Sequence, residues 1–330
     1  MTDPIAAIRK RARTLDKTIV FAEATEPRIL RACHQISELE IAKPILVGNK
    51  DEIRKTADSI RVEITEIEII DPQTSELTEI FATQYFDFRK HKSISETNAK
   101  TTLLEPLNFA NMMVRQNVAN GSVAGSVFAS REVIKSAVRL IGTEEKSQPI
   151  SSSFLMILPH FRETDNYPLL FADGAVIPFP DSGELAQIAI ASAKTFKKLL
   201  DIEPKVAMLS FSTKGSARHK EIEKIFEAIE IVKKRKPELI VDGEFQADAA
   251  LIPSIAQKKA PDSTIAGDAN VLIFPDLNSA NIAYKLTERL ANARAIGPIL
   301  QGLARPASDL SRGCTEDDII DAAAITALLT

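Results

Sequence analysis

Short apolar runs rich in β-branched residues alternate along the chain with longer amphipathic stretches. Residues 18–24 (TIVFAEA) are typical of a buried strand, and residues 26–39 follow with apolar side chains at helical spacing. The next pair begins at residues 43–48 (KPILVG), after which Asn49 is a suitable N-cap for a helix. This alternation predicts right-handed βαβ units and parallel sheets that are covered by helices on both faces.

The same pattern predicts elements along the rest of the chain, so the expected fold class is α/β with mainly parallel sheets. Further strands are predicted at residues 66–70, 122–126, 150–158, 169–176, 205–211, 239–241, 271–274 and 296–299. Further helices are predicted within residues 75–120 and at residues 132–141, 183–200, 220–234, 278–291 and 316–329.

The chain length suggests two domains, because 330 residues exceed one ordinary core of ~100–150 residues. The loop Ser147-Gln148-Pro149 is a candidate crossing point, and residues 296–302 are a candidate return. We therefore expect a discontinuous first α/β domain of residues 1–148 plus about 300–330. The second α/β domain is expected at residues 149–299.

Composition and charge narrow the classes of partner. Hydrophobic residues make up 45% of the chain and charged residues 26%, which is typical of a soluble globular protein. The formal net charge of -4 argues against nucleic acid and anionic membranes, so a negatively charged ligand would need a local cluster of Arg and Lys. Neither a secretory leader nor a run of ~18 apolar residues is visible, so we expect no membrane partner.

The cysteines and histidines favour a cytoplasmic protein without a metal. Cys33 and Cys314 lie far apart in the sequence and form neither a disulfide framework nor a metal-type pattern. The four histidines lack the paired spacing of a zinc site.

Candidate chemistry is concentrated in residues 309–318 (DLSRGCTEDD). Thr315, with Asp318 three residues later, resembles a capping box and predicts a helix start. The first amides and the dipole of such a helix favour an anion, for which Arg312 adds a forked donor and Ser311 a hydroxyl. On this pattern alone, a capped helix with a surface arginine remains the simpler interpretation.

A second polar loop follows the strand predicted at residues 205–211. Its donors could cradle a phosphate, although an ordinary helix-start loop fits equally well; they are Ser212, Thr213, Lys214 and Gly215. The chain lacks both GxxxxGK[ST] and GxGxxG, which argues against a nucleotide-binding Rossmann domain of the dehydrogenase type. Scattered basic residues matter only if the fold brings them together, and these are Arg28, Arg89, Lys135 and Arg289.

Several long stretches of the chain resemble one family, the phosphate acetyltransferase/phosphate butyryltransferase family. The match extends over almost the whole length, which makes it much more specific than any single motif. The stretches are KPILVGN (43–49), FAD (171–173), VAMLSFSTKGSA (206–217), VDGEFQADAAL (241–251), KKAPDS (258–263), ANVLIFPDLNSANIAYKL (269–286), IGPILQGL (296–303) and DLSRGC (309–314).

The resemblance implies a reversible reaction in which acetyl phosphate and coenzyme A give acetyl-CoA and phosphate. It implies two three-layer α/β/α domains with the architecture of the isocitrate and isopropylmalate dehydrogenases, and an active-site cleft between them. It also implies a homodimer. Coenzyme A is a substrate on this reading, and neither a tightly bound cofactor nor a metal is required.

The resemblance also assigns roles to residues. Asp318 matches an aspartate that helps to deprotonate the coenzyme A thiol, because an unperturbed thiol with a pKa of ~8.5 is mostly protonated at neutral pH. Ser311 matches a serine that hydrogen-bonds the reacting group, and Arg312 an arginine that stabilises phosphate and developing negative charge. Direct attack in a ternary complex is implied, with Cys314 as a packing neighbour. The resemblance implies substrate-binding roles for Arg289, Arg89, Arg28 and Lys135. At the position of Lys135 the family has an arginine.

The chain departs from the family pattern around residues 121–135 and at Ile177, where the family usually has Asn. These departures leave alternatives open. One is an acyltransferase that prefers propionyl or butyryl groups, and another is a non-catalytic homologue that binds coenzyme A. A dehydrogenase is suggested by the shared architecture alone.

Overall fold

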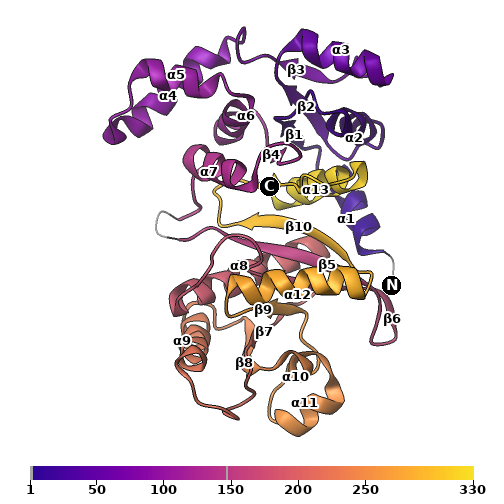
Figure 1. Ribbon diagram of the computed structural model, residues 1–330, viewed down its shortest axis with the longest axis vertical. Coiled ribbons are helices and arrows are strands. Elements are labelled where there is room, and N and C mark those ends of the chain that lie inside the picture. Colours follow the sequence, from indigo (N-terminus) through magenta and orange to yellow (C-terminus); the bar gives the residue numbers. More distant parts are fainter. Residues whose placement is uncertain (1–2, 146–147) are drawn as a thin grey trace. The chain divides into compact units, whose positions relative to one another are not determined.

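The computed structural model describes residues 3–145 and 148–330 (Figure 1). They form two compact units, one of residues 8–145 and 303–330 and the other of residues 3–7 and 148–302. Ser147, in the predicted crossing loop, lies outside the described residues. The division expected from the sequence, with boundaries at 148 and about 300, stays a prediction.

The unit of residues 8–145 and 303–330 contains a sheet in the order β3-β2-β1-β4-β11, and each of these strands is parallel to its neighbours. The chain passes outward from β1 to β3 and then returns to the other side of β1 at β4. Ligands of such sheets bind at this reversal, outside the carboxyl ends of the strands. The strands are β1 (Thr18–Phe21), β2 (Lys43–Val47), β3 (Glu68–Ile70), β4 (Gly121–Ala124) and β11 (Ala307–Asp309).

Helices cover this sheet, which explains why its central strands are apolar on both faces. Ile19, Val20 and Phe21 of β1 are fully buried. The last helix is buried on nearly every side. It packs against α2 (Figure 1). The helices of this unit are α2 (Pro27–Glu38), α3 (Lys50–Ile60), α4 (Leu77–Arg89), α5 (Glu96–Leu103), α6 (Pro106–Arg115), α7 (Ser130–Leu140) and α13 (Glu316–Leu329), with a 3-10 turn η1 (Lys90–Lys92). The division between the units falls within α1 (Pro4–Arg13).

An ion pair joins the two ends of the chain within this unit. The Arg9 Nε atom of α1 lies 2.6 Å from the buried carboxylate of Asp321 on α13. A second nitrogen of Arg9 lies 3.1 Å from the exposed Asp317. Because the Asp321 carboxylate is removed from water, this pairing is what makes its burial tolerable.

The other unit contains a sheet in the order β10-β5-β6-β9-β7-β8. The strands from β6 to β8 are parallel, whereas β10, β5 and β6 are antiparallel. The strands are β5 (Ser151–Phe161), β6 (Thr164–Ala172), β7 (Lys205–Leu209), β8 (Ile240–Phe245), β9 (Val271–Ile273) and β10 (Arg294–Gln301).

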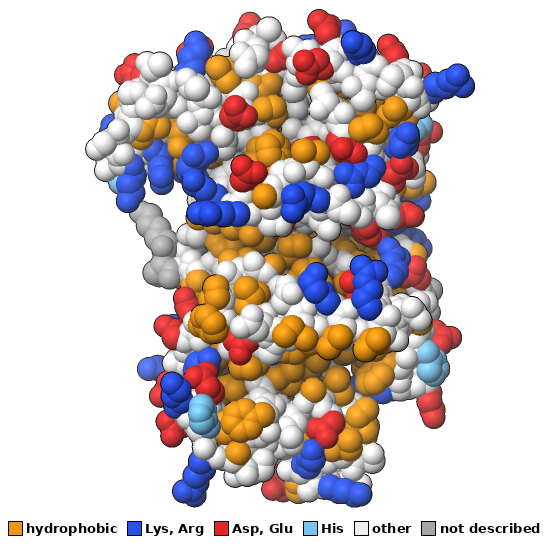
Figure 2. Space-filling model, in the orientation of Figure 1, with side chains coloured by type: hydrophobic (Ala, Val, Ile, Leu, Met, Phe, Trp, Pro, Cys, Tyr) orange, Lys and Arg blue, Asp and Glu red, His pale blue; other side chains and the backbone are white. Residues whose placement is uncertain are grey.

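The helices of this unit pack around an aromatic and aliphatic core that includes Phe154, Phe171, Phe245 and Leu272. Figure 2 shows that apolar side chains also reach the surface over α12. The helices are α8 (Ser182–Leu200), α9 (Lys220–Arg235), α10 (Ala247–Leu251), α11 (Pro253–Lys259) and α12 (Leu277–Leu290).

The predicted α/β class with mainly parallel sheets is confirmed, but two strand predictions needed correction. The strands predicted at 150–158 and 169–176 extend instead over Ser151–Phe161 and Thr164–Ala172, and they form an antiparallel hairpin. Its two-residue turn has φ of 51° at Arg162 and 57° at Glu163, as in the type I′ turns that suit hairpins. The usual Asn-Gly signal is missing there, so the sequence did not reveal it. The short strand β11 was also missed.

Candidate functional site

Three loops meet at the carboxyl ends of neighbouring parallel strands: residues 22–26 after β1, 125–129 after β4 and 310–315 after β11. The Leu310 N–H donates to the Ala124 carbonyl across 2.8 Å, which joins the last two loops. The sequence positions of these loops are about 100 and 185 residues apart, and the sheet order alone makes them adjacent.

The segment after β11 has the local structure that its sequence predicts. Thr315 is the N-cap of α13, and its hydroxyl accepts the Asp318 N–H at 3.2 Å. In return the Asp318 Oδ2 atom accepts the N–H of Thr315 at 2.8 Å and its hydroxyl at 2.9 Å, so the capping box is confirmed. No hydrogen bond from a described residue reaches the other oxygen, Oδ1. Asp318 can therefore cap the helix and still accept a proton.

Ser311 and Arg312 are exposed directly before this helix start. The guanidinium of Arg312 forms neither a hydrogen bond nor an ion pair with another described residue. The Ser311 Oγ atom accepts the Gly313 N–H at 3.3 Å. A forked cation and a hydroxyl beside a helix N-terminus are suited to an oxyanion such as phosphate.

Arg28, by contrast, is committed to the protein itself. Its Nη1 donates to the carbonyls of Arg312 at 3.0 Å and Cys314 at 2.8 Å, and its Nη2 donates to the Ser126 carbonyl at 3.2 Å. Its Nε donates to Glu26 at 2.8 Å. The side chain thus ties the three loops together, and its expected contact with substrate stays a prediction.

The Cys314 thiol is poorly suited to be a nucleophile. Burial raises the pKa of Cys314 to about 11; the charges of Asp318 and Glu23 add to the rise, and Arg28 opposes it. The thiol is therefore protonated at neutral pH, whereas the thiolate is the reactive form. This agrees with a packing role.

Two buried acids at this end of the sheet were missed by the sequence analysis. Glu23 lies two residues beyond β1, and its carboxylate accepts hydrogen bonds from the loop after β4. The signal for it was an acidic residue within the apolar run TIVFAEA. Asp309, at the end of β11, is 2% exposed, and none of the described donors, the nearby Ser130 hydroxyl included, reaches either of its carboxyl oxygens with good hydrogen-bond geometry. Burial raises the pKa of Asp309 to about 6, with the nearby Glu23 charge adding to the rise and the Ser130 hydroxyl opposing it.

The polar loop in the other unit already has internal partners. The Ser212 hydroxyl and the Gly215 N–H both donate to Glu244 Oε1, at 2.7 and 2.9 Å. Lys214 pairs with Asp242 at 2.5 Å. The Thr213 N–H donates to a neighbouring serine. The phosphate role expected of this loop therefore stays a prediction.

The remaining predicted basic residues are Arg89, Lys135 and Arg289. Arg89 is the last residue of α4, and Lys135 is exposed on α7. Neither side chain forms a hydrogen bond or ion pair with another part of the described chain. Arg289, near the end of α12 in the other unit, has a side chain 79% exposed, with Glu288 3.7 Å away. Their binding roles stay predictions.

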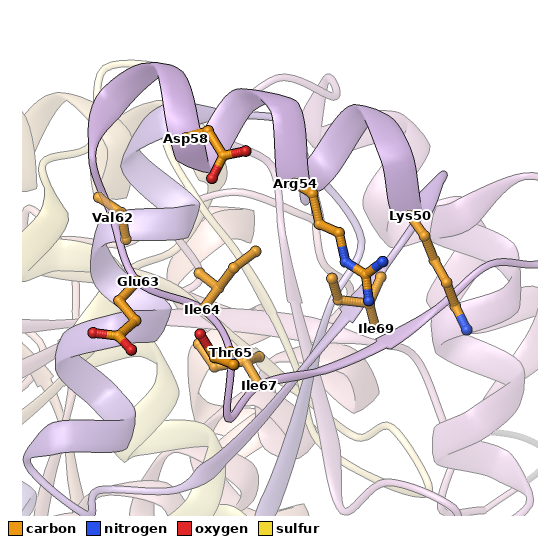
Figure 3. Close-up of a pocket in the computed structure, with 9 residues that line it drawn as sticks. All are labelled: Lys50, Arg54, Asp58, Val62, Glu63, Ile64, Thr65, Ile67 and Ile69. Atoms are coloured by element: carbon orange, nitrogen blue, oxygen red, sulfur yellow. The ribbon is translucent and has the colours of Figure 1, made fainter.

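A hollow of about 490 Å³ lies beside α3, and none of these predicted residues lines it (Figure 3). Figure 3 shows Arg54 reaching from the helix towards Ile69, with Lys50 extending beside it. Among the described residues, no group of three His, Cys, Asp or Glu side chains could hold a metal ion. No helix in the described ranges is long and apolar enough to cross a membrane.

Comparison with known proteins identifies relatives over the full length. A family model described as Phosphate acetyl/butaryl transferase matches residues 4–327. The phosphate acetyltransferase of Thermoanaerobacterium thermosaccharolyticum is 46% identical over 324 residues, covering 98% of both chains. The solved structure of EutD phosphotransacetylase from Staphylococcus aureus has a TM-score of 0.92 at 36% identity, covering 99% of this chain and 98% of that one.

A more distant structure shares the fold alone. A 4-hydroxythreonine-4-phosphate dehydrogenase from Burkholderia phymatum matches with a TM-score of 0.56 at 13% identity, covering 95% of this chain and 98% of that one. The expected dehydrogenase-like architecture is thus confirmed at the level of fold. A shared fold carries no information on activity.

Asp309→Asn should stabilise the protein at high pH. An unfolded Asp loses its proton near pH 3.9, whereas the folded Asp309 keeps it to a pH of about 6, so ionisation destabilises the fold progressively between these values. Above pH 6 the expected gain from the neutral amide is roughly 2–3 kcal/mol, and it should disappear towards pH 4. Urea unfolding at acidic and alkaline pH measures it, with the exposed Asp262→Asn as control. An equal gain in unfolding free energy at acidic and alkaline pH would contradict the raised pKa of Asp309.

Proposed function

Because this chain belongs to the Phosphate acetyl/butaryl transferase family, we propose that it is a phosphate acetyltransferase, which transfers an acetyl group reversibly between acetyl phosphate and coenzyme A. The observation that carries the proposal is the exposed pair Ser311 and Arg312 at the capped start of α13, with one oxygen of Asp318 left unbonded. These groups supply what acyl transfer from a phosphate requires: an anion site, a hydrogen-bond donor and a base.

The phosphate of the acyl phosphate would bind at Arg312. Its guanidinium can donate two parallel hydrogen bonds to phosphate oxygens, and the N-terminus of α13 adds a favourable potential. The Ser311 hydroxyl would donate to the reacting group. Negative charge grows on the carbonyl oxygen and then on the leaving phosphate, and donors fixed beforehand stabilise this charge most effectively.

The thiol proton would pass to Asp318. As the sulfur of coenzyme A attacks the acyl carbon, its proton moves to Oδ1 of Asp318, and the bond between the acyl carbon and the phosphate oxygen then breaks. Acetyl-CoA and phosphate leave, and Asp318 returns the proton to phosphate or water. Cys314 takes no part, which its raised pKa supports. Neither a tightly bound cofactor nor a metal is needed for these steps.

Both cysteines fit a reducing compartment. Cys33 and Cys314 are free and buried. Disulfides form and persist mainly in oxidising compartments, so two unpaired cysteines support the cytoplasm as the proposed location.

Acyl-CoA formation from acetyl, propionyl and butyryl phosphate tests the function and its acyl preference. We expect turnover, with the highest kcat/KM for acetyl phosphate; each added methylene in an apolar pocket changes the ratio by roughly 10–200-fold. A preference for butyryl phosphate would support the alternative acyltransferase. Absence of turnover with all three would leave the non-catalytic homologue.

Asp318→Asn should lower kcat by roughly 10²–10⁴-fold, because the amide cannot accept the thiol proton. The amide oxygen can still cap Thr315, so the thermal midpoint should change little. Asp317→Asn is the matched control, since Asp317 is the exposed neighbour that pairs with Arg9. An unchanged kcat for Asp318→Asn would leave Asp318 with only its capping role.

The proposed homodimer is supported by an exposed apolar stripe on α12. Ile282, Leu286 and Leu290 recur every four residues and are 52–80% exposed, and Phe179 beside the start of this helix is 77% exposed. Figure 2 shows this face as an apolar region of the surface. Apolar groups at this spacing on one helix face are typical of a surface that another protein covers.

Leu286→Asp should convert the dimer to a monomer, because a charge would be buried without a partner at the interface. Sedimentation of the wild type and the variant measures this. Phe226→Asp, which removes a single exposed aromatic on α9, should leave the dimer intact. A monomeric wild type would refute the proposed assembly.

A further inference from the structure

Glu23 lies where the order of its sheet reverses, between β1 and β4. The side chain is 6% exposed. Its Oε2 accepts the N–H groups of Gly125 at 3.0 Å and Ser126 at 2.8 Å, together with the Ser126 hydroxyl. Its Oε1 accepts the N–H groups of Val127 at 2.7 Å and Phe128 at 2.6 Å. Four successive amides therefore converge on one carboxylate.

Such an arrangement of amides is an anion-binding nest. In other doubly wound sheets, amides at this reversal point and at the following helix start hold the phosphate of a ligand. Here the anion is the chain's own carboxylate, which lies in the position that a ligand phosphate would otherwise take. An acyl phosphate must therefore be bound elsewhere. The exposed Arg312 is a candidate, because it lies on the loop after β11, the strand on the other side of β4 from β1.

The loop that Glu23 holds also supports the segment before Ser311. The Leu310 N–H donates to Ala124 at 2.8 Å. Gly125 has φ of +113°, and a side chain there would lie 2.5 Å from both the Asp309 carboxylate and the Leu310 nitrogen. The backbone at residues 124–125 is thus in direct contact with the base of the reacting segment.

A second link runs through Arg28. It donates to the Ser126 carbonyl at 3.2 Å and to the Arg312 carbonyl at 3.0 Å. A shift of the loop at residues 125–128 would therefore displace both contacts that hold Arg312: the Leu310–Ala124 hydrogen bond and the hydrogen bond from Arg28.

We propose that Glu23 is a positioning residue for acyl transfer. Its carboxylate fills the nest at the reversal point and fixes residues 125–128 against Leu310, which sets where Ser311 and Arg312 meet the acyl phosphate. The inference rests on the proposed function. Glu23 does not contact the reacting atoms, so its effect passes through the loop and should fall on kcat more than on KM.

Two variants test the role of the carboxylate. Glu23→Gln keeps the shape but turns an NH₂ group towards N–H donors, and Glu23→Gly empties the nest. A misplacement of ~1 Å can cost roughly 100-fold in rate, so we expect about that loss of kcat in both variants. Excess formate, which can occupy the emptied nest, should restore about tenfold or more of this loss in Glu23→Gly and none in Glu23→Gln.

Hydrogen exchange gives a readout that does not depend on activity. The amides of residues 125–128 and Leu310 should exchange about tenfold faster or more in Glu23→Gly, and formate should restore their protection. Asn111→Ala is the matched control. Asn111 accepts from Ser122 of β4 at 2.8 Å and donates to Ser136 of α7 at 2.9 Å. It therefore joins β4 and α7, the two elements on either side of the loop, without contacting the loop itself. This variant should lower the thermal midpoint but leave kcat and the loop amides unchanged.

The outcomes separate the two proposals. Two results for Glu23→Gly would overturn the positioning role. One is faster exchange of the loop amides with a kcat within about twofold of the wild type, and the other is exchange of these amides that does not change. An equal loss of kcat in Asn111→Ala would reduce Glu23 to general stability and would also overturn it. A wild type without turnover on any acyl phosphate would instead refute the proposed function.

Discussion

The hydrogen bonds between the Glu23 carboxylate and the amides of residues 125–128 hold together the end of the sheet on which the candidate chemistry is built. A buried carboxylate is costly unless donors replace the lost water, and buried amides are costly unless acceptors do the same. Each group here satisfies the other. These bonds hold the loop after β4 in place, and the segment after β11 is hydrogen-bonded to the strand end before it.

The other unit repeats this solution. Asp173, directly after β6, accepts the N–H groups of Ala175, Val176 and Ile177 and both donors of Ser152. Glu244 of β8 accepts donors from the loop after β7. The strand ends of both sheets are thus closed by acids of the chain itself. Under the proposed function, ligand binding would then depend on exposed side chains such as Arg312 more than on free loop amides.

Local features could be predicted from the sequence, whereas features that depend on distant contacts could not. The alternation of apolar runs and amphipathic stretches was sufficient for the α/β class, and Thr315 with Asp318 was sufficient for the start of α13. Strand β11 was missed because Ala-Ser-Asp has no apolar run, and its position is set by pairing with β4. Glu23 was missed because its partners lie 102–105 residues away. The roles of Ser311, Arg312 and Asp318 came from family resemblance, since their pattern alone fits a plain capped helix.

The raised pKa of Cys314 has a consequence for oxidative damage. Peroxides attack the thiolate, and the buried, protonated Cys314 offers very little of it at neutral pH. Cys33 is more protected still, because complete burial raises its pKa well above the ordinary value. An enzyme whose reacting segment carries a cysteine would normally be a target for sulfenic acid formation. Here burial keeps both sulfurs in the protonated form, which peroxides attack far more slowly than the thiolate.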